Sequence, residues 1–186
     1  MDDTQETWFE HFILSEELAP FNIFELLWDM KPDKPHQVVV YGKVYNTPRL
    51  QQAYGRDYAF AGTVSKSLPI PEELDSIIKA MSQRYNTQYN SLLVNWYRDG
   101  NDYIGHHSDN EKQLCETTPV ITISFGAERD FVLKNKLTKK TMTTTLKNNS
   151  VFVMGGTCQK THTHSIPKRK RVTSPRISVT LRQFTD

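Results

Sequence analysis

Short segments rich in β-branched and aromatic residues, separated by Gly, Pro or Asn, constrain the fold more than any other feature of this chain. Val, Ile, Thr, Tyr and Phe favour extended backbone, and turn residues at short intervals divide that backbone into many strands. The segments that we predict to be strands are 37–41, 58–64, 91–97, 119–125, 129–134, 141–146, 150–154 and 176–184. Most of these segments lie in the second half of the chain.

Two amphipathic stretches predict helices in the first half. Asn22 is a suitable N-cap for a helix that ends at Met30, and a second helix begins at Pro71 and carries an apolar stripe to Tyr85. Few helices early and many strands late predict a mainly β (α+β) fold, in which the helices pack outside a β-sandwich or jelly roll.

Length and composition narrow the class of protein. A chain of 186 residues is expected to form a single domain, and a formal net charge of +2 leaves nucleic-acid binding to local basic clusters at 134–140 and 168–171. Cys115 and Cys158 lie far apart without a Cys-x-x-Cys motif, which favours a reducing, intracellular compartment. No apolar stretch of membrane-spanning length and no signal-peptide pattern occur, so we expect no membrane partner. We also expect a monomer, because nothing in the sequence demands a larger assembly.

Three residues of metal-ligand type are spaced for a single site. His107 and Asp109 are two positions apart, so on extended backbone their side chains point the same way, and His164 follows later in THTHSIP. Two imidazoles and one carboxylate can occupy one face of an octahedral metal and leave three positions open, which suits non-haem Fe(II) oxygen chemistry.

A competing interpretation is a tetrahedral zinc site formed by the sulfur and imidazole ligands Cys115, Cys158, His162 and His164. Structural zinc sites usually draw their ligands from close pairs, and Cys115 has no near neighbour of ligand type. The spacing therefore favours iron.

The segment RISVTLR alternates without a break, and its polar side carries Arg176, Ser178, Thr180 and Arg182. One interpretation is a half-exposed strand with solvated charges. The other is one wall of a cofactor pocket, because an oxygenase of this type needs a reductant, usually 2-oxoglutarate, and the planar fork of an arginine binds a carboxylate through two hydrogen bonds.

The two arginines of this segment stand about 20 Å apart along a strand, so they cannot grip one carboxylate from the same direction. We expect Arg176 to bind the far carboxylate of 2-oxoglutarate, and Arg182 to lie near its metal-bound end and Asp109. Asn95 and Tyr97 share a face of the predicted strand 91–97 and are expected to complete the pocket.

Five segments, NWYRDGNDYIGHHSD, SFGAERDF, MGGTCQ, HSIP and SPRISVTLR, are similar in order and spacing to the signature segments of the AlkB family of Fe(II)- and 2-oxoglutarate-dependent dioxygenases. The resemblance covers residues 38 to 184 and is greatest to the eukaryotic DNA-repair branch. It implies a double-stranded β-helix (jelly roll) core over 91–186, preceded by an extension over 1–90 that holds helices and a nucleotide-recognition lid.

The resemblance also implies roles for the residues above. The implied iron ligands are His107, Asp109 and His164, with Arg182 beside them in the catalytic group. The implied 2-oxoglutarate contacts are Asn95, Tyr97, Arg176, Thr180 and Arg182, and Ser178 adds a hydroxyl to the same face.

Members of the family oxidise an N-alkyl group on a damaged base such as 1-methyladenine or 3-methylcytosine. The resemblance implies the same reaction here on single- or double-stranded DNA, with RNA left open. The reaction would use Fe(II), consume O2 and 2-oxoglutarate, and release formaldehyde, succinate and CO2. The alternatives are an oxygenase that acts on RNA, on a normal methyl mark or on a protein side chain, and a jelly-roll binding module without catalysis. The intact ligand set argues against the last.

Expected substrate contacts lie in three places. Tyr41, beside a glycine at a predicted hairpin tip, could fill the gap that an extruded base leaves, although an ordinary surface or core tyrosine is equally compatible. Family position implies base contacts for Tyr58, Phe60 and Glu111, while two aromatics at period two are also typical of core. Together with the basic stretch, the full set is Tyr41, Arg49, Tyr58, Phe60, Glu111, Lys168, Arg169, Lys170 and Arg171.

The basic stretch PKRKRV, 167–172, has two functional interpretations, a phosphate-contact loop and a nuclear localisation signal, beside a merely solvated charge run. We favour phosphate contact, and expect a nuclear or cytoplasmic location, with the nucleus favoured in a eukaryote. Asn110 departs from the acidic residue common at this position in the eukaryotic branch, which leaves lesion preference open.

Overall fold

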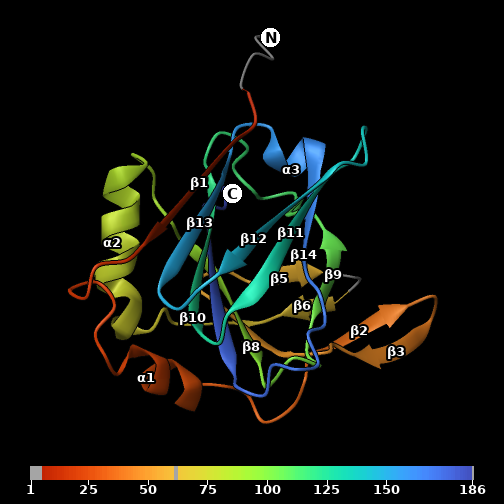
Figure 1. Cartoon of the computed structure of the whole chain (residues 1–186), viewed down its shortest axis with the longest axis horizontal. Coiled ribbons are helices and arrows are strands. Elements are labelled where there is room, and N and C mark those ends of the chain that lie inside the picture. Colours follow the sequence, from red (N-terminus) through yellow and green to blue (C-terminus); the bar gives the residue numbers. More distant parts are fainter. Residues whose placement is uncertain (1–5, 61–62, 186) are drawn as a thin grey trace.

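Two largely antiparallel sheets form the body of the structure, a computed structural model that describes residues 6–60 and 63–185, without the side chains of Val40 and Phe60 (Figure 1). The larger sheet has the order β1-β13-β10-β15-β8-β4-β7, made of Trp8–Ile13, Ser150–Gly155, Val120–Gly126, Arg176–Arg182, Ser91–Tyr97, Leu50–Tyr54 and Ser67–Leu68. The smaller sheet has the order β12-β11-β14-β9, made of Thr141–Leu146, Arg129–Asn135, His162–Ile166 and Ile104–His107.

Helices and two hairpins complete the structure. The hairpins are β2–β3, made of Gln37–Val40 and Lys43–Asn46, and β5–β6, made of Tyr58–Phe60 and Thr63–Ser65. The helical elements are α1 (Ile23–Asp29), the 3₁₀ turn η1 (Glu72–Leu74), α2 (Asp75–Arg84) and α3 (Cys158–Thr161). Within the described residues, no helix is both long enough and apolar enough to span a bilayer.

The outer face of the larger sheet packs against α1 and α2, which lie on one side of the molecule (Figure 1). The apolar side of β15, with Ile177 and Val179, lies in this core together with Leu27 of α1 and Ile77 of α2. Trp96 is fully buried there, and its indole N–H donates to the carbonyl of Leu27 at 2.8 Å. That bond satisfies the one polar group of a side chain otherwise suited to a core.

The inner face of the larger sheet turns towards the smaller sheet, and the polar side of β15 lies on it. Every residue from Arg176 to Arg182 is buried, because β15 is the central strand and both of its faces are covered. The half-exposed interpretation of RISVTLR is therefore wrong. A clean alternation often marks a strand with one face in water, but here the second sheet replaces the water.

The mainly β fold with outer helices and a sandwich of two sheets confirms the predicted class, and both predicted helices are present. One predicted strand, 58–64, is instead a hairpin in which Phe60 pairs with Thr63. The predicted strands did not include β1, β4, β7, β9 and β14. Strands from the first 90 residues, β1 and β4, belong to the same sheet as later ones, and the division of the chain near residue 90 stays a prediction.

Candidate metal and cofactor site

Pairing between two strands of the smaller sheet brings the candidate metal ligands together. His107 at the end of β9 lies directly opposite His164 on β14, with ring centroids 4.3 Å apart. Asp109 follows β9, and its Oδ2 lies 4.0 Å from Nε2 of His164. One ligand atom from each of the three residues lies within 4.8 Å of the others, and no other group of three or more His, Cys, Asp or Glu in the described residues does so.

The alternative zinc set is not assembled. Its four residues do not form a group in the described part of the chain. Cys158, the first residue of α3, is buried, which raises the pKa of its thiol, and Cys115 contacts the hydroxyl of Thr117 at 3.3 Å. His162 contacts Thr161 and Asn135 instead of a sulfur. The structure therefore favours the His-Asp-His set.

The protonation states of the triad suit a metal cation. Burial, helped by the neighbouring His107, lowers the pKa of His164 to about 3, so the imidazole is neutral at pH 7. Burial alone would raise the pKa of Asp109, but Arg182, His164 and His107 together lower it to about 2. Burial also lowers the pKa of His107. Two neutral imidazoles and one carboxylate are the forms that bind a metal.

Polar atoms of the triad that lack a hydrogen-bond partner show whether a metal ion fits this site. Among the described residues no hydrogen-bond partner reaches the buried Oδ2 of Asp109, the oxygen that faces Nε2 of His164. Nδ1 of His107 contacts the carbonyl of Gly105 at 2.9 Å, which fixes the ring and leaves Nε2 available. Buried polar atoms without partners are rare, so the donor set fits a divalent ion such as Fe(II).

The strand register places polar side chains of β15, β8 and β10 together on the inner face of the larger sheet, beside the triad. We call this polar surface the cofactor floor. On β15, Arg176 pairs with Tyr97 of β8, and Ser178 pairs with Asn95 on one side and Ser124 of β10 on the other. These side chains and the triad imidazoles line one cavity between the sheets. Its lining is Arg49, Tyr58, Leu93, Asn95, Tyr97, Ile104, His107, Thr122, Phe131, His164, Ile166, Arg176, Ser178, Thr180 and Arg182.

Arg176 supplies a buried cation at one end of this cavity. It is 1% exposed, its Nη2 donates to Oγ of Ser124 at 2.8 Å, and its guanidinium lies 5.0 Å from the ring centroid of Tyr97. Nε and Nη1 have no hydrogen-bond partner in the described part of the chain. An unpaired buried charge is costly, so a carboxylate that accepts two hydrogen bonds from Arg176 suits this site.

Arg182 lies at the other end, next to the triad. Its Nη2 donates to Oδ1 of Asp109 at 2.7 Å, and the ring of Tyr58 lies 5.2 Å from its guanidinium. Despite its burial, the anions around it, Asp109 first and Glu111 next, raise the pKa of Arg182. The two arginines therefore lie at opposite ends of one pocket, as the sequence led us to expect.

Arg49, expected to contact substrate, lines the same cavity, and its substrate role stays a prediction. It is buried in the wall of the cavity, where Nε donates to Oδ1 of Asn95 at 2.7 Å and Nη2 to Oε1 of Gln51 at 3.1 Å. Burial lowers the pKa of its guanidinium. Arg49 thus adds a third cation to the lining, after Arg176 and Arg182, and orients Asn95. The sequence did not predict these hydrogen bonds, because β4, which begins at the next residue, was not predicted.

The other expected substrate residues are spread from the pocket to the surface. Tyr58 is buried beside Arg182 and Glu111, and burial raises its pKa, while Glu111 is only half-buried. The side chain of Phe60 lies outside the described part of the structure. Tyr41 is fully exposed, which excludes a core role, and both it and Gly42 have positive φ, 49° and 74°, as a type I′ hairpin turn requires.

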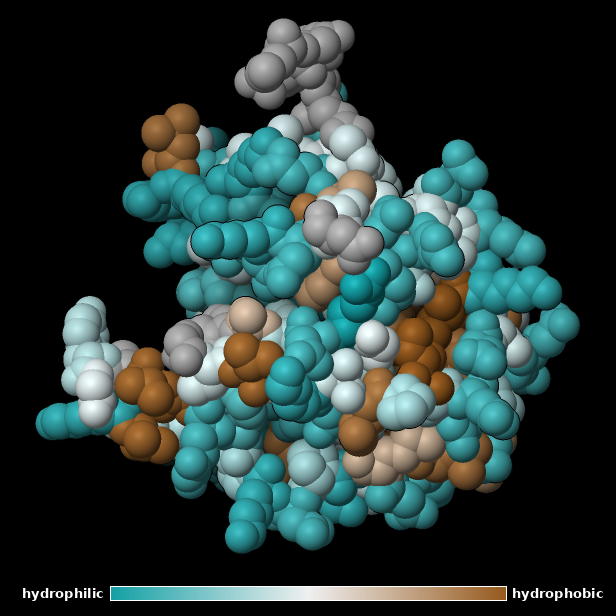
Figure 2. Space-filling model, turned by 180° about the vertical axis from the view of Figure 1, so that it is seen from behind, coloured by the Kyte–Doolittle hydropathy of each residue, from teal (hydrophilic) through white to brown (hydrophobic). Residues whose placement is uncertain are grey.

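The hairpin β2–β3 projects from the body and carries exposed hydrophobic side chains on both strands (Figure 2). Besides Tyr41 these are Val39, Val44 and Tyr45. A notch separates the hairpin from the rest of the surface on that side in Figure 2. Exposed apolar side chains gathered on one projecting element indicate a binding surface.

The basic loop 168–171 is exposed but its backbone is fixed. The amide of Arg169 donates to the carbonyl of Gly100 at 2.7 Å, and the amide of Gly100 donates to the carbonyl of Val172 at 2.7 Å. A Cβ at residue 100 would lie 1.8 Å from the carbonyl oxygen of Arg169, so only glycine allows this approach. Arg169 pairs with Asp130, whereas Lys168 lies over the ring of Tyr103.

Comparisons with known proteins agree with this geometry. A family model described as the 2OG-Fe(II) oxygenase superfamily matches residues 3–182. The chain is 33% identical over 159 residues to the DNA oxidative demethylase ALKBH2 of Mus musculus, covering 80% of this chain and 66% of that protein. It is 34% identical over 137 residues to the Arabidopsis thaliana protein of the same name, covering 61% of this chain and 43% of the relative.

A second group of relatives and a solved structure extend the comparison. The chain is 28% identical over 174 residues to the alpha-ketoglutarate-dependent dioxygenase alkB homolog 3 of Mus musculus, covering 86% of this chain and 60% of that protein. It superposes on the structure of OsALKBH1 with a TM-score of 0.63 at 15% identity, covering 93% of this chain and 97% of that one, which supports the fold. The chain thus spans about 43 to 66% of the length of the ALKBH2 relatives.

Proposed function

Since the chain belongs to the 2OG-Fe(II) oxygenase superfamily, as an AlkB-type member, we propose that it repairs N-alkylated bases in DNA, of the 1-methyladenine and 3-methylcytosine type, by oxidative dealkylation. One observation carries the proposal. The two histidines of a His-Asp-His set line one end of a cavity, and a buried arginine with two unsatisfied N–H groups lines the other end, in a chain that resembles DNA oxidative demethylases.

The cofactors of this family are Fe(II), 2-oxoglutarate and O2. His107, Asp109 and His164 would hold the iron, and Arg176 would bind the far carboxylate of 2-oxoglutarate, assisted by the hydroxyls of Ser178 and Thr180. With these groups bound, the alkyl carbon is hydroxylated at the expense of 2-oxoglutarate, which becomes succinate and CO2, and the product loses formaldehyde.

The protein's own part in this reaction is to bind and to orient. Arg182 holds one oxygen of Asp109 at 2.7 Å and thereby leaves the other oxygen for the metal. Tyr58 covers the guanidinium of Arg182 and, with burial around the triad, limits access of water to this end of the pocket. Asn95, fixed by Arg49, and Tyr97 would orient the cosubstrate between the two ends.

Substrate binding would involve the hairpin tip, residues near the metal end of the pocket, and the basic loop. A base in a duplex must be extruded at a cost of a few kcal/mol, and Tyr41 at the hairpin tip would occupy the space that the base leaves. Tyr58 and Phe60 would contact the extruded base, and Glu111 would favour a base made cationic by alkylation. Lys168, Lys170 and Arg171 would bind phosphates, as side chains of an exposed loop whose backbone is fixed.

The test is formaldehyde release from methylated single- and double-stranded DNA and RNA oligonucleotides, with and without Fe(II) and 2-oxoglutarate. Formaldehyde release from alkylated DNA that needs both cofactors supports the proposal. Faster release from RNA would instead favour the alternative of an oxygenase that acts on RNA. The proposal fails if the cofactors bind and no nucleic acid yields formaldehyde. Unmethylated oligonucleotides of the same sequence are the control.

A further inference from the structure

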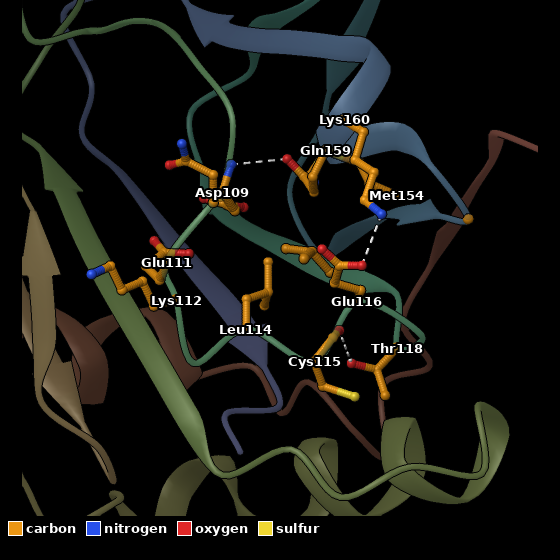
Figure 3. A pocket seen from close by; sticks show the side chains of 13 residues that line it. Asp109, Glu111, Lys112, Leu114, Cys115, Glu116, Thr118, Met154, Gln159 and Lys160 are labelled. Carbon is orange, nitrogen blue, oxygen red and sulfur yellow. Dashed lines mark hydrogen bonds and ion pairs between the residues drawn. The ribbon is translucent and has the colours of Figure 1, made fainter. Parts of the chain in front are cut away.

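Gln159 lies behind the metal-binding segment, on the short helix α3, and is half-buried. Its Oε1 accepts a hydrogen bond from the backbone N–H of Asp109 at 2.9 Å, across 50 residues of sequence (Figure 3). Both residues line a cavity of about 370 Å³ whose apolar part includes Leu114 and Met154. This cavity lies apart from the cofactor floor, and its only triad member among the described residues is Asp109.

The orientation of the Gln159 amide follows from its two contacts. A backbone N–H can only donate, so the oxygen of the carboxamide must face Asp109. The nitrogen then faces Met154, and Nε2 lies 3.5 Å from its thioether sulfur. The side chain is therefore fixed at both ends of its amide and is not free to turn away.

Each polar group of Asp109 has a separate task. Its Oδ1 accepts from Arg182 at 2.7 Å, its N–H donates to Gln159 at 2.9 Å, and its Oδ2 has no hydrogen-bond partner among the residues described. Aspartate in irregular backbone often uses its carboxylate to accept from nearby main-chain N–H groups. Gln159 and Arg182 together leave only Oδ2 directed at the position between the two imidazoles.

A second tie joins the same two segments. Oγ of Ser108 donates to the carbonyl of His162 at 2.7 Å. The segment after His107 is thus tied at two successive residues to the segment that leads into His164. These two bonds hold His107 and Asp109 close to His164, and they form without nucleic acid.

We propose that Gln159 is a positioning residue for the metal site: it holds the backbone of Asp109 so that Oδ2 faces the metal. The inference rests on the proposed function in that the metal is the Fe(II) of this family. It concerns assembly of the site, so it is tested by metal binding without substrate.

The experiment measures the Kd of wild-type protein and of Gln159→Met for Co(II) alone, from the visible absorption of the bound ion, without 2-oxoglutarate or nucleic acid. Methionine has nearly the same length but cannot accept the bond. We expect Kd to rise about ten-fold, the lower range for loss of a group that orients a ligand, and the absorption spectrum to change. Gln88→Met, at an exposed position, is the matched control and should bind as wild type does.

A merely structural role would lower the unfolding midpoint of the metal-free protein and leave Kd unchanged, so both are measured. Gln159→Asn, one methylene too short to reach Asp109, replaces the methionine variant if that protein does not fold. Wild-type Kd in a folded Gln159 variant overturns the inference while leaving the proposed function standing. If the variants bind Co(II) ten-fold more weakly but wild-type protein releases no formaldehyde, the inference holds and the proposed function fails.

Discussion

The cofactor pocket and the β2–β3 hairpin differ in almost every physical respect. Arg176 in the pocket is 1% exposed and lies on the central strand of a seven-stranded sheet, while Tyr41 at the hairpin tip is 101% exposed and its strands pair only with each other in the described structure. Two-stranded hairpins are marginally stable by themselves. The fold therefore fixes the pocket more firmly than the hairpin, whose two strands have no further strand beside them in the described structure.

This contrast separates two kinds of residue. The buried guanidinium of Arg176 keeps two N–H groups without a protein partner among the described residues, which suits a small ligand of defined shape that the packed sheets can hold without substrate. Tyr41 on the hairpin and Lys170 and Arg171 in the basic loop are exposed instead, and we expect them to act only against another molecule. Substitutions in the pocket should weaken cofactor binding, and substitutions on the hairpin or the basic loop should weaken only the interaction with nucleic acid.

The largest effect is expected from His107→Ala. Removing one of three ligands should reduce formaldehyde release at least 1,000-fold and abolish Co(II) binding, because two protein ligands rarely hold Fe(II). His107 is only half-buried at the end of an edge strand, so the unfolding midpoint of the metal-free protein should stay close to that of wild type. Measurable turnover with bound Fe(II) would remove His107 from the ligand set.

A smaller effect distinguishes the two arginines within the pocket. Arg176→Met should raise the 2-oxoglutarate concentration needed for half-maximal rate about 100-fold, because the charge-assisted hydrogen bonds to the far carboxylate are removed, while Co(II) affinity changes little. Arg182→Met should weaken the binding of both 2-oxoglutarate and Co(II), since it also frees Oδ1 of Asp109. Titrations of each ligand against both variants check this, and equal losses in the two variants would contradict the assigned division.

On the exposed side, the combined variant Lys168→Ala, Lys170→Ala, Arg171→Ala should weaken DNA binding about ten-fold at low salt, whatever the sequence. The slope of log Kd against log salt should fall by about 0.9 for each phosphate that the loop no longer neutralises. Fluorescence anisotropy at several salt concentrations measures both quantities. Lys79→Ala, an exposed lysine on α2, is the control, and a salt slope equal to that of wild type would exclude the loop from phosphate binding.

The smallest effect is expected from Tyr41→Ala. Formaldehyde release from methylated duplex should fall about five-fold, because no aromatic side chain then fills the space of the extruded base, while release from single strands stays unchanged. Tyr45→Ala on the same hairpin is the matched control, since Tyr45 is exposed but not at the turn. Equal losses on duplex and single strand would argue against a wedge role for Tyr41.

Parts of the site could be predicted because their chemistry is visible in the residues themselves. Ligand types two positions apart at the end of a strand, and two arginines on one side of an alternating segment, point to a metal and a dicarboxylate. Arg49 was expected only as a substrate contact, and Gln51 was not predicted at all, because their segment looks like a surface segment until it is seen to lie beside Asn95. Gln159 was missed for a related reason, since its hydrogen bond is to a backbone group 50 residues away.

The burial of β15 shows where sequence patterns mislead. Alternation correctly predicted which side chains share a face, but it cannot say whether water or another sheet lies against the polar face. The smaller sheet, with β9 and β14, covers it. Neither of those two strands was predicted, since both are short and each contains two histidines.

The most direct test of the central claim compares two products in one variant. The claim is that the pocket works independently of the exposed surface, so the variant combines Tyr41→Ala with the three basic-loop substitutions. Succinate formation from 2-oxoglutarate without nucleic acid should equal that of wild-type protein, while formaldehyde release from methylated duplex should fall by more than about ten-fold. A parallel fall of both products would contradict the claim.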